Sequence, residues 1–118
     1  MSAALDSWEA ARDFALTLPG TELSTSYGKP AVKLAANGRA ILGTGREPGN
    51  SFVLHIDIAT AEMLMASAPE TFWQTPHYEG YPAVLVRFDS PDPERVRAMI
   101  AQAHEQAAAL PPPGKRRR

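Results

Sequence analysis

A hairpin signal in the first half of the chain restricts the possible folds most strongly. Asn37-Gly38 is a dipeptide that favours a tight turn with positive φ angles, and it separates two stretches, residues 29–35 and 39–43, that both have the composition of strands. A short loop, residues 44–50, then leads to a third strand at residues 51–57. Parallel strands need a crossover of about a dozen residues or more. We therefore expect an antiparallel sheet.

Helical spacing of apolar residues predicts a helix at each end of the chain. The first stripe can be capped by Asp6 or Ser7, and the dipeptide Pro19-Gly20 ends it. The last helix begins at the cap Asp92. A short helix is expected at residues 60–68, an aromatic turn at 69–74 and a strand at 83–88. The two stripes consist of Leu5, Trp8, Ala11, Ala15 and Leu18, and of Val96, Ile100, Ala103, Ala107 and Leu110.

This order of elements predicts an α+β fold, a two-layer sandwich in which helices pack on one face of an antiparallel sheet. Side chains alternate between the two faces of a strand. The face toward the helices should hold Val32, Leu34, Phe52, Leu54, Ile56, Val84, Val86 and Phe88. The opposite, open face should hold Lys33, Arg39, His55, Asp57, Leu85 and Arg87, together with Val53.

Length and composition favour a single intracellular domain. The 118 residues, 44% of them hydrophobic, suffice for one compact core, which we expect over residues 1–110, followed by a disordered proline-rich spacer and basic tail at 111–118. The chain has no cysteine, and its start lacks the charged and apolar regions of a signal peptide. No apolar run approaches the roughly 18 residues of a membrane span. We expect a cytoplasmic protein without membrane contact, and assume a monomer.

The charge is distributed unevenly along the chain. The net charge is −1, but residues 115–118 are all basic, and without them 8 basic residues face 13 acidic ones. The sign reverses between residues 23 and 46, where the charged side chains are Lys29, Lys33, Arg39 and Arg46. Such a basic strand region beside acidic helices favours a local surface for polyanions rather than indiscriminate coating of nucleic acid.

The densest cluster of unusual residues is the segment TPHYEGYP at residues 75–82. His77 and Glu79 offer an acid–base pair or, with His55 and Asp57, a set of metal ligands. The competing interpretation is structural: tyrosines pack over the sheet edge while the glycine makes a turn. Nothing in the spacing requires these groups to converge, so we expect no catalytic residue, no metal ligand and no cofactor.

Four motifs in their order also resemble one known family. The segments LPGTE at residues 18–22, TSYGKPA at 25–31, PETF at 69–72 and TPHYEGYP at 75–82 closely resemble the MmcQ/YjbR family, over almost the whole chain to about Leu110. The resemblance implies a small α+β fold like that of frataxin-type proteins, with hairpins described as a double wing, and a non-enzymatic DNA-binding role. The tail at 111–118 and the acidic body depart from that pattern.

Applied to this sequence, the resemblance places a wing at residues 29–39. Phosphate contacts require only positive charge and loose positioning, and base stacking requires aromatic faces. The nucleic-acid-binding candidates are therefore Lys29, Lys33, Arg39, Arg46 and Arg87 for phosphates, and Tyr27, Tyr78 and Tyr81, with His77, in the aromatic turn. Alternatively, the charges merely solvate an open face, or the chain is a small-ligand or protein-partner module with a groove between His77 and Pro82.

Overall fold

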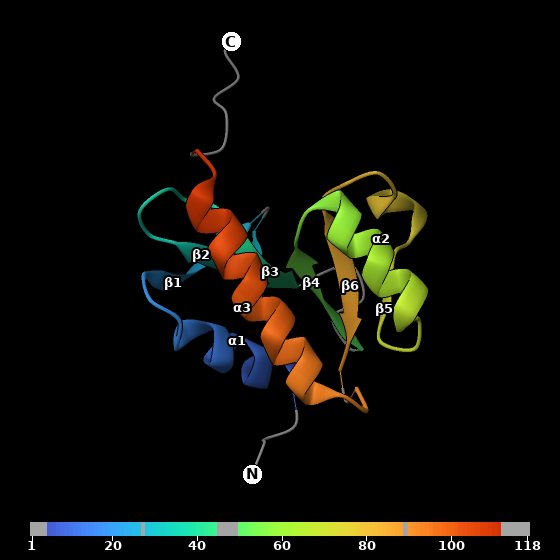
Figure 1. Ribbon diagram of the computed structural model, residues 1–118. Coiled ribbons are helices and arrows are strands. Elements are labelled where there is room, and N and C mark those ends of the chain that lie inside the picture. Colours follow the sequence, from blue (N-terminus) through green and yellow to red (C-terminus); the bar gives the residue numbers. More distant parts are fainter. Residues whose placement is uncertain (1–4, 27, 45–49, 89, 112–118) are drawn as a thin grey trace.

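In the residues that the structure describes, three helices pack on one face of a six-stranded antiparallel sheet (Figure 1). This computed structural model describes residues 5–26, 28–44, 50–88 and 90–111, and the side chains of Ser26 and His77 lie outside that description. The helices are α1 (Trp8–Leu16), α2 (Ile58–Ser67) and α3 (Pro93–Ala109). The strands are β1 (Thr21–Ser26), β2 (Lys29–Leu34), β3 (Ala40–Thr44), β4 (Ser51–His55), β5 (Phe72–Trp73) and β6 (Ala83–Arg87), with a 3-10 turn, η1 (Pro76–Tyr78), between the last two. The predicted α+β fold is confirmed.

The strands lie in the order β1-β2-β3-β4-β6-β5, and every neighbouring pair is antiparallel. The predicted hairpin joins β2 to β3, and Gly38 at its tip has φ +73°. The register shifts by one residue between Val32 and Lys33. This bulge leaves Ile41 without a partner across the pair, and both Ile41 and Leu42 are buried in the main core.

The prediction omitted two strands, one at each edge of the sheet. No strand was expected between Gly20 and residue 29, and residues 69–74 were expected to form an aromatic turn. The structure forms β1 in the first of these segments and the two-residue strand β5 in the second. Neither segment has a run of β-branched and apolar residues. β1 is mostly serine and threonine, and it becomes a strand because it pairs with β2 along its whole length.

The main core lies between the sheet and the helices. Every residue expected to face the helices belongs to it or packs against it, as do the apolar stripes of α1 and α3 except for the exposed Leu110. The largest fully buried side chains there include Phe52 and Phe72. Within the described residues, no helix combines the length and the apolar character needed to cross a membrane.

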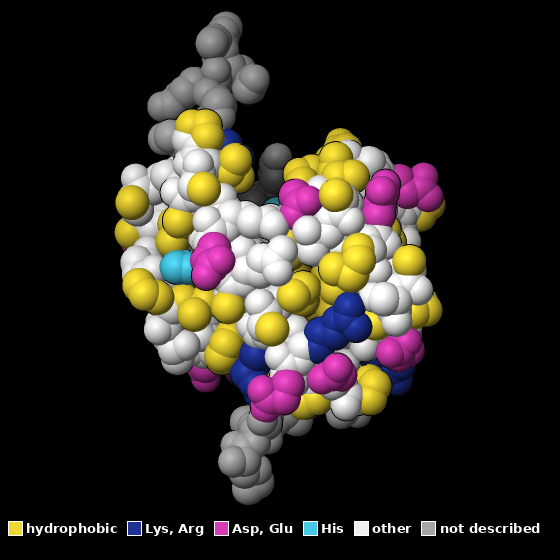
Figure 2. Space-filling view, in the orientation of Figure 1, with side chains coloured by type: hydrophobic (Ala, Val, Ile, Leu, Met, Phe, Trp, Pro, Cys, Tyr) yellow, Lys and Arg dark blue, Asp and Glu magenta, His cyan; other side chains and the backbone are white. Residues whose placement is uncertain are grey.

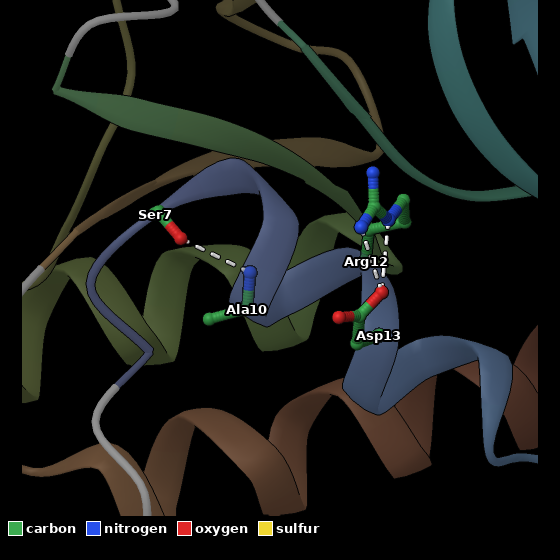
Figure 3. A network of polar contacts seen from close by, with 4 residues as sticks. All are labelled: Ser7, Ala10, Arg12 and Asp13. Carbon is green, nitrogen blue, oxygen red and sulfur yellow. Dashed lines mark hydrogen bonds and ion pairs between the residues drawn. The ribbon is translucent and has the colours of Figure 1, made fainter.

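Local sequence signals set the beginnings of the helices. The Ser7 hydroxyl accepts a hydrogen bond from the Ala10 amide at 3.1 Å and caps α1, whose next turn carries an ion pair between Arg12 and Asp13 (Figure 3). Asp57 caps α2 in the same way through the Thr60 amide, at 3.1 Å. That cap explains why α2 begins two residues before the predicted start.

Three polar contacts fix α3 against distant parts of the chain. His104 lies 2.7 Å from the Pro19 carbonyl oxygen, and the Gln106 amide donates to the Asp57 carboxylate at 2.6 Å. The Asn37 side chain donates to the carbonyl of Ala107 at 2.9 Å. Asp57 therefore faces the helices, and the expectation that it lies on the opposite face of the sheet was wrong, because β4 has ended at His55 and strand alternation no longer applies.

Candidate nucleic-acid interface

The candidate interface lies on the face of the sheet opposite the three helices, called the helix-free face below. One continuous row of cross-strand partners crosses this face over all six strands. The row is largely apolar and consists of Ser24, Ala31, Gly43, Val53, Leu85 and Trp73.

The middle of this row is buried rather than open. Ala31 is fully buried, and Val53 and Leu85 are each 4% exposed. Val53 and Leu85 form a small second cluster with Ala83, against which Trp73 and Tyr78 pack. The expected mixture of apolar and basic side chains is present, but its apolar part contributes to packing and not to an exposed surface.

Two of the five predicted cations lie on β2, on either side of the buried row. Lys29 and Lys33 each stand two residues from Ala31, so all three share the helix-free face. Lys29 is exposed and Lys33 half-buried. The two lysines are four positions apart along the strand, which corresponds to about 13 Å. Lys33 stands directly opposite Glu22 of β1, an acidic neighbour that the prediction missed because it did not assign β1 as a strand.

Arg87 is the third cation on this face, at the exposed end of β6. It follows Leu85 by two residues, and the antiparallel order puts it at the same end of the sheet as Lys29. Three strand spacings separate β2 from β6, which places Lys29 and Arg87 about 14 Å apart. The Arg87 guanidinium lies 3.4 Å from the Glu70 carbonyl oxygen. The three cations therefore surround the apolar row and do not meet at one point.

Arg39 lies elsewhere. Its guanidinium Nε donates to the Pro111 carbonyl at 2.7 Å, next to the end of α3. The expectation that Arg39 lies on the helix-free face was wrong. The extra residue at the bulge makes Ala40 the partner of Lys33, so Ala40 shares the helix-free face and the preceding Arg39 lies on the other side of the sheet. Tyr27 and Arg46, the remaining predicted residues of this segment, lie outside the described residues.

The TPHYEGYP segment forms η1 and the tight turn that leads into β6. Gly80 has φ +80°, a conformation that favours glycine, and the Gln74 side chain donates to the Ala83 carbonyl at 2.7 Å. Tyr78 packs on the second cluster, whereas Tyr81 is 58% exposed. The side chain of His77 lies outside the described part of the structure. The turn thus holds one tyrosine inward and one outward, just before the start of β6.

His55 occupies the helix-free face two residues from Val53. Burial, and then the positive charge of Lys33, lower its pKa from 6.5 to about 4. The ring is therefore neutral at pH 7 and adds no charge to the face. The Asp57 carboxylate, in contrast, caps α2, and hydrogen bonds from the Thr60 side chain lower its pKa most. Among the described residues, no group of three acidic or histidine side chains is placed to hold a metal ion.

Comparisons with known proteins identify only partial relatives. No protein-family model matches the chain. It is 30% identical over 67 residues to uncharacterized proteins of Mycobacterium bovis and Mycobacterium tuberculosis, a match that covers 54% of this chain and 52% of each relative. The chain thus spans about half the length of the curated relatives it matches. No solved structure matches with significance.

Proposed function

We propose that this protein is a non-enzymatic nucleic-acid-binding protein of the MmcQ/YjbR type, which contacts phosphates through its helix-free face. The observation that carries the proposal is the common orientation of Lys29, Lys33 and Arg87 on that face. On the helix-covered side, acidic and basic side chains are mixed (Figure 2). The described strand residues of the helix-free face carry these three cations and one acid, Glu22.

The spacing of the three cations suits a phosphate backbone better than a compact ligand. Separations of about 13–14 Å are too large for one phosphate group to bridge, but several phosphates along a strand can each meet one cation. Exposed Tyr81 lies two residues before the start of β6, at the end of the strand opposite to Arg87, and provides a face on which an unpaired base can stack. The proposal also draws on the family resemblance of the four motifs in the sequence, which implies a wing at residues 29–39.

Salt-dependent binding tests the proposal. Fluorescence anisotropy with labelled duplex DNA and with single-stranded oligonucleotides would be measured over a range of salt concentrations. Three phosphate contacts predict a logarithmic slope of roughly −2.7 on duplex DNA, since each contact contributes about −0.9. We expect the double variant Lys29→Gln/Lys33→Gln to lose the part of this slope that roughly two phosphate contacts supply, and to bind at least tenfold more weakly.

A matched control removes two cations from the helix layer. Arg12→Gln/Arg97→Gln makes the same change in net charge, and both arginines already pair with neighbouring acids, Asp13 and Glu94. We expect this variant to keep most of the affinity. Absence of binding at low salt, or equal losses in the two double variants, would contradict the proposal. Thermal unfolding of each variant checks that the fold is retained.

A further inference from the structure

The two edges of the sheet differ in length. β5 closes one edge with two residues, whereas β1 closes the other with six, all paired with β2. Within the described residues, no strand pairs with the outer side of β1. Figure 1 shows β1 at the margin of the sheet, beside the end of α1.

The hydrogen-bond alternation identifies the backbone groups that point outward from β1. The Ala35 amide donates to the Gly20 carbonyl at 2.8 Å, so Gly20 directs its groups toward β2. Every second residue after it does the same, because backbone groups alternate sides along a strand. The N–H and C=O groups of Thr21, Leu23 and Thr25 therefore point away from the sheet, and the described part of the chain gives them no hydrogen-bond partner.

β1 lacks the features that usually prevent edge-to-edge pairing. Proline, lysine and inward-pointing charges are the common protections of an edge strand. The sequence TELSTS contains neither proline nor lysine, and its single charged residue, Glu22, stands opposite Lys33. At the centre of β1, the residue whose backbone N–H and C=O point outward is Leu23, and its side chain is 57% exposed. Leu16, at the end of α1, is a second exposed leucine, and Thr21 bonds to the neighbouring Ala15 carbonyl at 3.1 Å.

We propose that two copies of this chain associate through β1, antiparallel and about a two-fold axis at Leu23, and so continue the sheet from one copy into the other. In this register Leu23 faces Leu23 of the second copy, and Thr21 faces Thr25. All three outward residues of each strand then form hydrogen bonds, six in total by the antiparallel pattern.

The strand sequence favours a second copy over an unrelated peptide. In the same register Glu22 faces Ser24 of the second copy, so no like charges stand directly opposite each other. The exposed Leu23 side chains of the two copies then cover one another on the helix side of the sheet. The two-fold axis also places both helix-free faces on the same side of the continued sheet.

A single engineered cysteine tests the register directly, because the chain contains no cysteine. Directly opposed residues of a hydrogen-bonded pair have Cα atoms about 5.5 Å apart, within the range of a disulfide. Leu23→Cys should therefore form a disulfide-linked dimer under mild oxidation. Thr25→Cys is the matched control, since its own counterpart would lie four residues away, about 13 Å, and should not crosslink comparably.

Solution mass measurements test the association itself. Sedimentation equilibrium of the full chain should give twice the 12.8 kDa of one copy. Leu23→Pro removes an amide that the monomer does not use and should weaken dimerisation at least tenfold while the chain stays folded. Leu23→Lys should act similarly, whereas Ile58→Lys, at an exposed position on α2, should not. A monomer at all concentrations, or equal crosslinking of the two cysteine variants, would overturn the proposal.

Discussion

His55 shows how position on the sheet changes the chemistry of one side chain. The sequence places it on the face opposite Leu54, beside charged neighbours, where a role as a metal ligand together with Asp57, His77 and Glu79 was an alternative. In the structure the half-buried ring loses part of its hydration and interacts with the positive charge of Lys33, and both effects lower its pKa. A histidine that is neutral at pH 7 cannot contribute to phosphate binding by charge, so the cationic part of the face depends on lysine and arginine.

This lowered pKa predicts acid sensitivity. The folded state binds a proton at His55 only near pH 4, whereas the unfolded chain does so near 6.5. The contribution of His55 is therefore present above pH 6.5 and is lost as the pH falls toward 4. We expect the loss of this contribution to lower the free energy of unfolding by about 2 kcal/mol between pH 7 and pH 5. Urea unfolding at both pH values measures the change.

His55→Gln should reduce this pH dependence by that amount, while the contribution of the carboxylates remains. Lys33→Gln should raise the His55 pKa, which NMR titration of the ring reports directly. If the free energy of unfolding of the parent and of His55→Gln changed equally with pH, the pKa of His55 would not be lowered in the folded state, and the prediction would be wrong.

At the scale of elements, the turn of the β2–β3 hairpin forms hydrogen bonds with the end of α3, a contact called the clamp below. The side chain of Asn37 donates to the carbonyl of Ala107 at 2.9 Å and to that of Leu110 at 3.1 Å, and it accepts from the Arg39 amide at 3.0 Å. Carbonyl groups at a helix end have no partner within the helix. The asparagine thus supports the turn and terminates a helix about 70 residues away in sequence.

Asn37→Ala is expected to destabilise the protein by about 1–3 kcal/mol, because it leaves several backbone groups without their partners. Asn37→Asp keeps the acceptor for Arg39 but brings a negative charge to the negative end of α3 and should be at least as harmful. Urea unfolding measures both. The control is Asn50→Ala at an exposed turn, for which we expect a change within about 0.5 kcal/mol. A loss at Asn37 no larger than at Asn50 would argue against the clamp.

At the scale of the whole molecule, charge and fold are separable contributions to polyanion binding. Four of the 12 basic residues lie at positions 115–118, beyond the described part of the chain. Four adjacent cations bind any polyanion weakly without help from the folded domain. The orientation of the sheet cations, in contrast, depends on the register of β2 and β6.

Truncation after Pro111 separates the two contributions. The shortened chain should bind DNA more weakly but retain the part of the salt slope that Lys29, Lys33 and Arg87 supply. Anisotropy titrations of the full and shortened chains, each with and without the double lysine substitution, measure the two contributions independently. Complete loss of affinity with the tail would leave the sheet face without a role in binding.

The sequence alone determined the hairpin, the beginnings of α1 and α3 and the alternation that fills the main core. These features arise from neighbouring residues: Gly38 favours the turn, Ser7 and Asp92 cap helices, and Leu54 and Val84 face inward because strand alternation has a period of two. Local preference was sufficient at each of these positions.

Only the tertiary structure decided the edges of the sheet and the composition of the candidate interface. β1 and β5 are strands because they pair with β2 and β6, and their sequences have little preference of their own. Because of a bulge, Arg39 does not lie on the helix-free face, and Glu22 lies on it because β1 pairs with β2. Contacts between distant segments set these positions, so neighbouring residues alone do not determine them.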